Sequence, residues 1–412
     1  MNSSKLIIAI IVIMVIGFSI IGYSMLSLYS EVQKEVINLN STILHASNET
    51  QTGLSNKIAN LANEIGFLES KVNNLNSSAY SSINSLQKQL NQLVYQLNFP
   101  VTIIDATNTS VTIPSYPERI ISLDPASTEI LLSIGAGNQL IGVDNDSFYY
   151  LPPNFEKQLI TLYNEGKLVN IGSTYSGPNI ETIIAERPDL VIGTYQWSFS
   201  STAQVLKNYG IPVVLLPSYN SLSDLYTAII MVGKATGHVN QAVNLVENIS
   251  KEISYIRQLT QNVTPQNVSY LLWINPTYVA AGGTFQNDMI TLSGNNNAFS
   301  NMSGWPVISP EELLKANPSI IIIDSNYGLI NESDLIFWLN QTIGNAYENI
   351  SAIKYGKVYA ISGYYEDYLN EPGPMVVQGI ELFVSITHPS ILNITSVPEL
   401  ITPNDFNLTS IS

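Results

Sequence analysis

The chain has 412 residues, of which 45% are apolar and only 12% are charged, and its formal net charge is −16. This excess of acid disfavours nucleic acid as a partner, because phosphates attract basic surfaces. No cysteine occurs, which excludes disulfides, thiolate metal ligands and a lipid-modified cysteine anchor. The length predicts two or three globular units with additional segments.

The N-terminal residues predict attachment to a membrane. Residues 6–28 contain no charge and are long enough to cross a bilayer as a helix. Lys5 precedes them, which favours an orientation with the N-terminus inside. A cleaved secretory signal is the alternative, but the apolar run is longer than a typical signal core and no small-x-small cleavage site follows it. We expect residues 1–5 to be a cytoplasmic or cleaved leader, residues 6–28 a single-pass cell-membrane anchor, and the remainder extracellular.

Acceptor motifs for N-glycosylation are frequent, which agrees with an exported, glycosylated surface. Because a chain rich in Asn and Ser creates some of them by chance, each is only a candidate acceptor. They are Asn40, Asn48, Asn76, Asn108, Asn145, Asn248, Asn262, Asn267, Asn301, Asn331, Asn340, Asn349, Asn393 and Asn407.

Residues 29–98 differ in composition and are rich in Asn, Ser, Gln and Leu. Their apolar residues step alternately by four and three positions, which is a heptad pattern. A continuous helix here would span roughly 100 Å. We expect a coiled-coil stalk that forms a homo-oligomer, with a helix folded back on the globular part as the alternative. The clearest heptad residues are Leu54, Ile58, Leu61, Ile65, Leu68, Val72 and Leu75.

The globular part begins to show its architecture between Pro117 and Val143. Ile120–Leu123 is a short β-branched run that predicts a strand. Asp124 is suited to cap a helix that has Pro125 at its first position, and Gly135 is suited to end that helix. A second strand follows at Leu140–Val143. This strand–helix–strand unit requires a buried parallel sheet.

The same alternation continues to the C-terminus and predicts an α/β fold. A long helical stretch, Ser221–His238 and Asn240–Gln261, separates two halves, while Asp144–Asn154 and Gly363–Pro374 read as loops. The other expected strands are Val101–Asp105, Ser110–Pro114, Val169–Gly172, Asp189–Gly193, Gly210–Pro217, Val268–Ile274, Val279–Ala281, Ile320–Asp324 and Lys357–Ile361. The other expected helices are Asn179–Glu186, Thr202–Asn208, Asp288–Ser293, Pro310–Ala316, Asp334–Leu339 and Pro374–Ile386.

No motif for an enzyme or a metal centre stands out. Gly135-Ala-Gly137 lacks the third glycine of a dinucleotide loop and follows a helix rather than a strand. The histidines, His45, His238 and His388, are dispersed and form no ligand cluster. A nucleophile elbow, a Cys–His pair and a spaced acid pair are all missing. We therefore predict no catalytic residue, no cofactor and no metal.

Aromatic residues recur in the segments between the expected elements. For any single one, packing over the core is an equally good explanation. Together they suit a cleft that holds a large, flat, partly apolar ligand. The predicted ligand-binding residues are Tyr149, Tyr150, Tyr175, Trp197, Tyr278, Trp305, Tyr364, Tyr365 and Tyr368.

Several segments, in order, resemble the substrate-binding proteins of ABC importers for cobalamin, iron-siderophores and haem. The similarity covers roughly residues 99 to 390. The segments are PERIISLDPASTEILLSIGAGNQLIGV, NIETIIAERPDLVIG, LLWINPTYVAAGGTFQNDMITLSGNNNAF, GWPVISPEELLKANPSIIII, AIKYGKVYAI and EPGPMVVQGIELF.

The resemblance implies two Rossmann-like lobes bridged by a long backbone helix, with a small-molecule ligand held between them. The corresponding boundaries are residues 99–220 for the N-terminal lobe, 221–262 for the connecting helix, 263–395 for the C-terminal lobe and 396–412 for a tail. With the anchor and the stalk in front of it, we expect a membrane-anchored, archaeal member of this family.

The resemblance also implies roles for individual residues. Tyr175, Tyr278 and Trp305 match pocket aromatics of the family, and Glu181 and Glu311 match the glutamates, one per lobe, that dock onto the ABC permease. Arginines that hold anionic siderophores have no counterpart in the expected cleft loops. This ranks a cobalamin-like corrinoid ahead of haem and neutral hydroxamate siderophores. A structural or adhesive surface protein and a ligand sensor with the same fold are the alternatives.

Overall fold

The structure of the protein is a computed structural model, which describes residues 99–173, 176–195, 197–325, 330–406 and 408, together with helical residues scattered between 30 and 82. The chain divides into two compact units, Met1–Leu97 and Asn98–Ser412. The predicted anchor, residues 6–28, lies outside the described residues. Among the helices that are described, none has the length and apolar character needed to cross a membrane.

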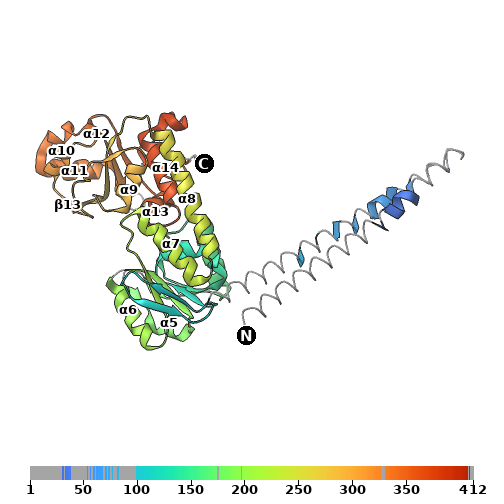
Figure 1. The fold of residues 1–412 in the computed structure, drawn as a ribbon. Helices are drawn as coiled ribbons and strands as arrows, with labels where there is room; N and C mark the ends of the chain where they lie inside the picture. The colour runs from blue at the N-terminus through green and yellow to red at the C-terminus, as the bar shows by residue number, and fades with distance from the viewer. Residues whose placement is uncertain are drawn as a thin grey trace. The chain divides into compact units, whose positions relative to one another are not determined.

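The described part of the first unit is helical (Figure 1). Lys71 Nζ lies 3.9 Å from Glu31 Oε1, whereas a single straight helix would separate these residues by about 60 Å. Two helical segments therefore meet here. Of the clearest heptad residues only Ile65 is described, and its side chain is 44% exposed. Oligomerisation through the stalk stays a prediction.

The N-terminal lobe is built on a five-stranded parallel sheet, as the strand–helix–strand unit between Pro117 and Val143 predicts, and β3 (Ile120–Ser122) lies at its centre. Alternate residues of these strands point to opposite faces. One face packs on helices α5 (Ile180–Glu186) and α6 (Trp197–Asn208), and the other faces α3 (Pro125–Ser133). The strand order is β5 (Val169–Asn170), β4 (Leu140–Val143), β3 (Ile120–Ser122), β8 (Leu190–Thr194) and β9 (Val213–Leu216).

The local signals at α3 are confirmed. The Asp124 carboxylate accepts a hydrogen bond from the Ser127 amide, and Pro125 occupies the first helical turn. Gly135 follows with φ 81°, a left-handed conformation that glycine adopts without strain. These residues fix where β3 ends and where the helix begins, and so they place Asp124 at the carboxyl edge of the sheet.

Smaller elements complete this lobe. Strands β1 (Val101–Ile104) and β2 (Ser110–Ile113) form the predicted antiparallel hairpin. Helix α4 (Pro153–Asn164) begins at the last two residues of the expected loop and continues through a segment for which no element was predicted. The elements not yet named are η1 (Ala136–Gln139), η2 (Asp146–Phe148), β6 (Gly172–Ser173) and β7 (Gly177–Pro178).

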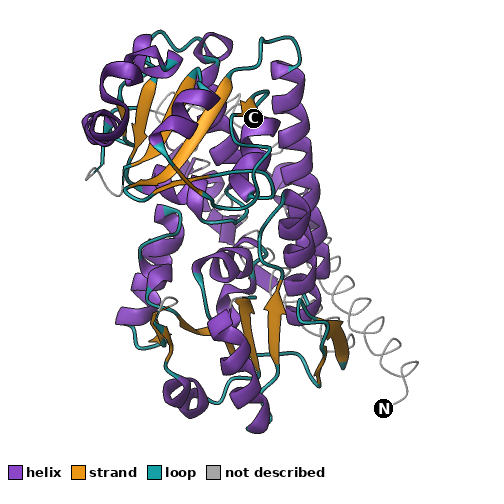
Figure 2. Cartoon of the chain, turned by 90° about the vertical axis from the view of Figure 1, so that its left-hand side faces the viewer, coloured by secondary structure: helices purple, strands orange, loops and turns teal. Residues whose placement is uncertain are grey.

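The connection between the lobes consists of two helices rather than one. Gly237 ends α7 (Leu222–Thr236) with φ 81°, and α8 (Val239–Thr260) follows. The two helices pack closely, because a Cβ on Gly233 would lie only 2.4 Å from that of Ala242. Helix α7 packs on the N-terminal lobe, whereas α8 contacts helices of the C-terminal lobe. Figure 2 shows both lobes beside these helices.

The C-terminal lobe has a seven-stranded mixed sheet, with antiparallel strands only at one side. Its order is β13 (Val307–Ile308), β11 (Thr277–Val279), β10 (Asn267–Ile274), β14 (Ile320–Asp324), β15 (Val358–Ile361) and β16 (Leu400–Ile401), with β12 (Asn296–Asn297) also on β10. The helices and turns are α9 (Phe285–Leu292), α10 (Pro310–Ala316), α11 (Glu332–Ile343), η3 (Gly344–Asn349), α12 (Ser351–Lys354), α13 (Tyr364–Asn370), α14 (Val376–Thr387) and η4 (Pro389–Leu392).

Two features of this lobe differ from the sequence analysis. Helix α13 replaces part of a predicted loop, so Glu366 and Asp367 are successive helical residues. Strand β16 brings Leu400–Ile401 into the sheet beside β15. Residues assigned to a tail thus contribute to the C-terminal lobe.

Candidate ligand-binding site

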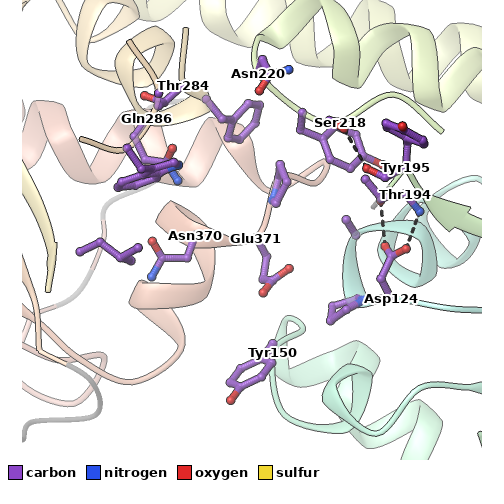
Figure 3. A pocket seen from close by; sticks show the side chains of 18 of the residues that line it. Asp124, Tyr150, Thr194, Tyr195, Ser218, Asn220, Thr284, Gln286, Asn370 and Glu371 are labelled. Atoms are coloured by element: carbon purple, nitrogen blue, oxygen red, sulfur yellow. Dashed lines mark hydrogen bonds between the residues drawn. The ribbon is translucent and has the colours of Figure 1, made fainter. Parts of the chain in front are cut away.

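A cavity of about 490 Å³ lies between the two lobes (Figure 3). Both lobes contribute to its wall, as the family resemblance predicts. The lining residues are Asp124, Pro125, Ala126, Asp146, Tyr150, Thr194, Tyr195, Ser218, Tyr219, Asn220, Leu272, Gly283, Thr284, Phe285, Gln286, Gly304, Trp305, Asn370, Glu371 and Pro372.

The N-terminal lobe lines the cavity with residues that follow its parallel strands. Asp124 comes after β3, Asp146 after β4 and Ser218 after β9, and Thr194 is the last residue of β8. Parallel strands bring their carboxyl ends to one edge of a sheet, and ligands of open α/β sheets bind outside that edge. The position of the cavity is therefore a consequence of the sheet topology.

Asp124 holds two of these segments together. Its carboxylate accepts hydrogen bonds from the Ser127 amide at 2.8 Å, the Thr194 amide at 2.6 Å and the Thr194 hydroxyl at 3.1 Å. Burial raises the pKa of Asp124, while these hydrogen bonds act in the opposite direction. Asp124 therefore fixes the end of β8 against the start of α3, with its hydrogen-bonding capacity largely satisfied.

The C-terminal lobe contributes mainly amide and aromatic side chains. The Gln286 amide donates to the Leu369 carbonyl at 2.8 Å, which ties α9 to α13. Asn370 accepts from the Tyr270 hydroxyl at 2.7 Å and donates to the Asp324 carboxylate. The half-buried Trp305 packs edge-on against Tyr270, with ring centroids 6.4 Å apart. This wall offers both stacking surface and hydrogen-bonding groups.

Three carboxylates, those of Asp124, Asp146 and Glu371, line the cavity, and its described lining contains no lysine, arginine or histidine. Burial holds the pKa of Glu371 well above its usual value, and the nearby carboxylates of Asp367 and Asp124 act in the same direction. Because its described lining has acidic groups and no cationic side chain, the cavity suits a ligand without a large negative charge.

The structure brings some of the predicted ligand-binding residues together. Tyr150 and Trp305 line the cavity, from opposite lobes. Tyr149 and Tyr278 are 62% and 37% exposed and do not line it. Tyr175 lies outside the described residues.

The other predicted aromatics occupy α6 and α13. Trp197 is the first residue of α6, and its side chain is not described. Tyr364, Tyr365 and Tyr368 pack against one another in α13, with ring centroids 5.1 to 5.7 Å apart. Tyr365 and Tyr368 are nearly fully buried, and the Tyr365 hydroxyl donates to the Phe406 carbonyl. Tyr365 and Tyr368 thus lie in the core and the half-buried Tyr364 packs against it, and none of the three lines the cavity.

Polar lining residues were the ones that sequence reasoning missed. Asp124 was expected only as a helix cap, and no role was predicted for Thr194, Gln286, Asn370 or Glu371. A usable signal existed for the first two, since each stands where a strand of a parallel sheet ends. Glu371 lies in a segment with aromatic neighbours, and the predicted binding role in that segment went to the tyrosines rather than to the acid.

The two predicted docking residues are both exposed in the first turn of a short helix. Glu181 follows the capping residue Asn179 of α5. Glu311 lies in α10, where Ser309 and Glu312 form the predicted capping box. Because Glu312 supplies the reciprocal hydrogen bond, Glu311 is free of that role.

Comparison with known proteins agrees with this geometry. A sequence profile of the periplasmic binding protein family matches residues 120–365. The uncharacterized ABC transporter substrate-binding lipoprotein YvrC of Bacillus subtilis is 28% identical over 298 residues, covering 71% of this chain and 86% of that protein. The vitamin B12-binding protein of Pectobacterium carotovorum is 29% identical over 228 residues, covering 55% and 77% of the two chains.

Solved structures show the same fold. The crystal structure of a possible iron-binding, periplasmic solute-binding protein from Staphylococcus epidermidis superposes with a TM-score of 0.55 at 26% identity, covering 66% of this chain and all of the other. The chain belongs to the periplasmic binding protein family, within the group of ABC-transporter substrate-binding proteins of the cobalamin, haem and siderophore type. It is thus a non-enzymatic transporter component that binds a small ligand, and the prediction that it is not an enzyme is confirmed.

Proposed function

We propose that the protein captures a cobalamin-like corrinoid, or an iron complex of a siderophore or haem, in the cavity between its lobes and delivers it to an ABC permease. The observation that carries this proposal is the cavity itself, which both lobes line at the carboxyl edge of the N-terminal sheet. A ligand that binds in a cleft between two lobes can change the orientation of one lobe relative to the other. A permease can then bind the liganded orientation in preference to the empty one.

The lining supports a corrinoid as the first candidate. Corrinoids carry a broad apolar macrocycle with amide side chains at its edge. Trp305, Tyr150 and Tyr195 offer stacking surface, while Asn220 and Gln286 offer amides. Haem carries two carboxylates, which the carboxylates of the cavity would repel. The vitamin B12-binding relative from Pectobacterium carotovorum points to the same class of ligand.

We further propose that Tyr150 and Trp305 contact the ligand and that Glu181 and Glu311 contact the permease. Family resemblance supports the second assignment, as does the exposure of both glutamates at the start of one helix in each lobe. Residues 6–28 would anchor the protein on the outer side of the cell membrane, and residues 29–98 would hold the lobes away from it. The uncharged span and the heptad pattern support this arrangement.

Isothermal titration of the full chain with cyanocobalamin, haem and a neutral ferric hydroxamate tests the ligand assignment. We expect saturable binding of at least one compound, with cyanocobalamin tighter than haem. Binding of haem alone would overturn the ranking. Binding of none would favour the alternative, a structural, adhesive or sensing surface protein that uses the same fold.

A further inference from the structure

Charges of opposite sign are segregated in the described globular unit. Every lysine and arginine in residues 99–408 lies exposed on its surface. Several carboxylates, in contrast, are buried between the lobes or behind the cavity, including Asp124, Glu129, Asp144 and Asp367. The exposed basic residues are Arg119, Lys157, Lys167, Arg187, Lys207, Lys234, Lys251, Arg257, Lys315, Lys354 and Lys357.

The three carboxylates that line the cavity differ in how they are satisfied. Asp124 accepts three hydrogen bonds from the Ser127 and Thr194 groups. Asp146 accepts from the Ser173 hydroxyl at 3.3 Å. The Glu371 carboxylate receives no hydrogen bond and no ion pair from the described residues. In Figure 3 it points into the cavity beyond the end of α13.

The surroundings of Glu371 add to its negative potential. Carboxylates approach it from three sides, namely Asp367 on its own helix, Asp124 and Asp144 after β3 and β4, and Glu129 on α3. Glu371 is half-buried. A carboxylate partly withdrawn from water without a partner is costly, and a positive charge placed beside it reduces that cost. A positively charged group on a ligand can therefore supply the partner that the Glu371 carboxylate lacks.

We propose that the cavity selects ligands with a net positive charge and that Glu371 is the residue that makes this selection. This inference rests on the proposed function and narrows its ligand class. Two chemistries supply a suitable charge: a corrinoid whose cobalt keeps a neutral axial ligand, and a ferric hydroxamate with a protonated amine. Glu371 contacts the cationic part in either case, while Trp305 and Tyr150 accept the apolar part.

Matched ligand pairs test the charge without altering the protein. Aquacobalamin and cyanocobalamin share the corrinoid but differ in charge at the axial position, and ferrioxamine B is cationic whereas ferrioxamine E is neutral. With the full chain at neutral pH, we expect the cationic member of one pair to bind about tenfold more tightly, or 1.4 kcal/mol. The preference should shrink as salt rises from about 0.05 M to about 0.5 M.

Glu371→Gln keeps the shape of the side chain and removes its charge. We expect it to abolish the preference within the pair while the neutral member binds as before. Glu247→Gln removes an exposed carboxylate from α8 and should leave the preference intact. If Glu371→Gln does not fold, Glu371→Asp, which keeps the charge on a shorter side chain, should retain the preference for the cation but weaken it, and an unchanged preference would overturn the role of Glu371.

The outcomes separate this inference from the proposed function. Equal binding of cationic and neutral members, or a preference that Glu371→Gln retains, overturns the charge selection and leaves the receptor function standing. Saturable binding confined to the corrinoid pair or to the hydroxamate pair identifies the source of the charge. Failure of every compound to bind overturns the proposed function, and the charge selection with it.

Discussion

At the scale of single residues, Glu371 couples ligand binding to protons. Burial holds its pKa well above the usual value, and Asp367, Asp124, Asp144 and Glu129 act in the same direction. In the empty cavity the ionised form of this carboxyl group is therefore disfavoured. A cationic ligand favours the ionised form, so its binding should release a proton.

The affinity for ferrioxamine B should therefore rise with pH until Glu371 is ionised in the empty cavity, by up to about tenfold per pH unit. At pH values where the ferrioxamine B amine stays protonated, the change reports on the protein. Ferrioxamine E is the control and should show a much flatter profile. Titration calorimetry in buffers of different ionisation enthalpy measures the released proton directly, and a flat ferrioxamine B profile contradicts this account.

Trp305 and Tyr368 should respond differently to truncation although both are aromatic residues of the C-terminal lobe. Trp305 lines the cavity and Tyr368 lies in the α13 cluster at 8% exposure. Trp305→Ala should weaken ligand binding by about 1–3 kcal/mol. Tyr368→Ala should instead lower the free energy of unfolding by about 3–5 kcal/mol. Calorimetry measures the ligand affinity and chemical denaturation measures the free energy of unfolding. If Trp305→Ala instead lowered stability and Tyr368→Ala instead weakened binding, the placement of both residues would be refuted.

At the scale of elements, the start of α14 depends on a residue of the other lobe. The Met375 amide donates to Glu129 Oε1 on α3 at 2.8 Å, and α14 has no capping side chain of its own. Gly373 leaves room for this contact, since a Cβ there would overlap the Glu129 carboxylate. Glu129 thus links the two lobes through the end of a helix.

This link predicts how stability depends on pH. Burial raises the pKa of Glu129 from 4.5 to about 8, with the Met375 hydrogen bond acting in the opposite direction. Between these values the folded protein keeps a proton that the unfolded chain has lost, so stability falls as pH rises, by up to about 1.4 kcal/mol per pH unit for this group. Above the folded pKa the dependence levels off.

Melting temperatures at a series of pH values measure the effect. Glu129→Gln keeps an acceptor for Met375 without a titratable group, and its profile should be shallower than that of the unmodified protein. Glu247→Gln on the exposed face of α8 is the matched control and should reproduce the unmodified profile. Asp367, whose pKa burial raises to about 8, contributes a similar slope that both variants retain. Identical slopes in all three proteins would rule out Glu129.

At the scale of the whole molecule, docking and ligand binding should be separable. Glu181 and Glu311 lie on the surface, outside the residues that line the cavity. Replacing both by arginine should abolish uptake in vesicles containing the permease, because charge pairs at an interface rim govern encounter and orientation. Ligand affinity should stay within about twofold, roughly 0.4 kcal/mol. If the double variant still supported full uptake, the docking role would be refuted, and the two glutamates would only stabilise the first turns of their helices.

Removal of residues 1–98 tests the proposed anchor and stalk. The residues that remain belong to the second compact unit and contain both lobes and every residue of the described cavity lining. The shortened protein should be monomeric in detergent-free buffer by sedimentation, and its ligand affinity should equal that of the full chain. Loss of binding on this truncation would show that the stalk takes part in the site.

The sequence by itself determined the class of fold and most of its elements. Capping residues and short β-branched runs are local signals, so α10 and β14 lie at the residues predicted for them. The ordered family segments indicated the two-lobed architecture and Trp305 as a pocket aromatic, and the recurrence of aromatics between elements indicated Tyr150. Both residues line the cavity. Local signals were weakest in α13, where Tyr365, Tyr368 and Leu369 show helical spacing over only two turns.

Only the tertiary structure decided which polar groups meet in the cavity. Asp124, Thr194 and Glu371 are far apart in the chain, and their convergence depends on the strand order and on how α13 meets α3. No local pattern encodes that order, because the central strands β3, β8 and β14 are buried on both faces and their apolar residues do not specify which strand lies beside them. The charge of the site is for the same reason a property of the folded molecule: its carboxylates come together only when the two lobes pack.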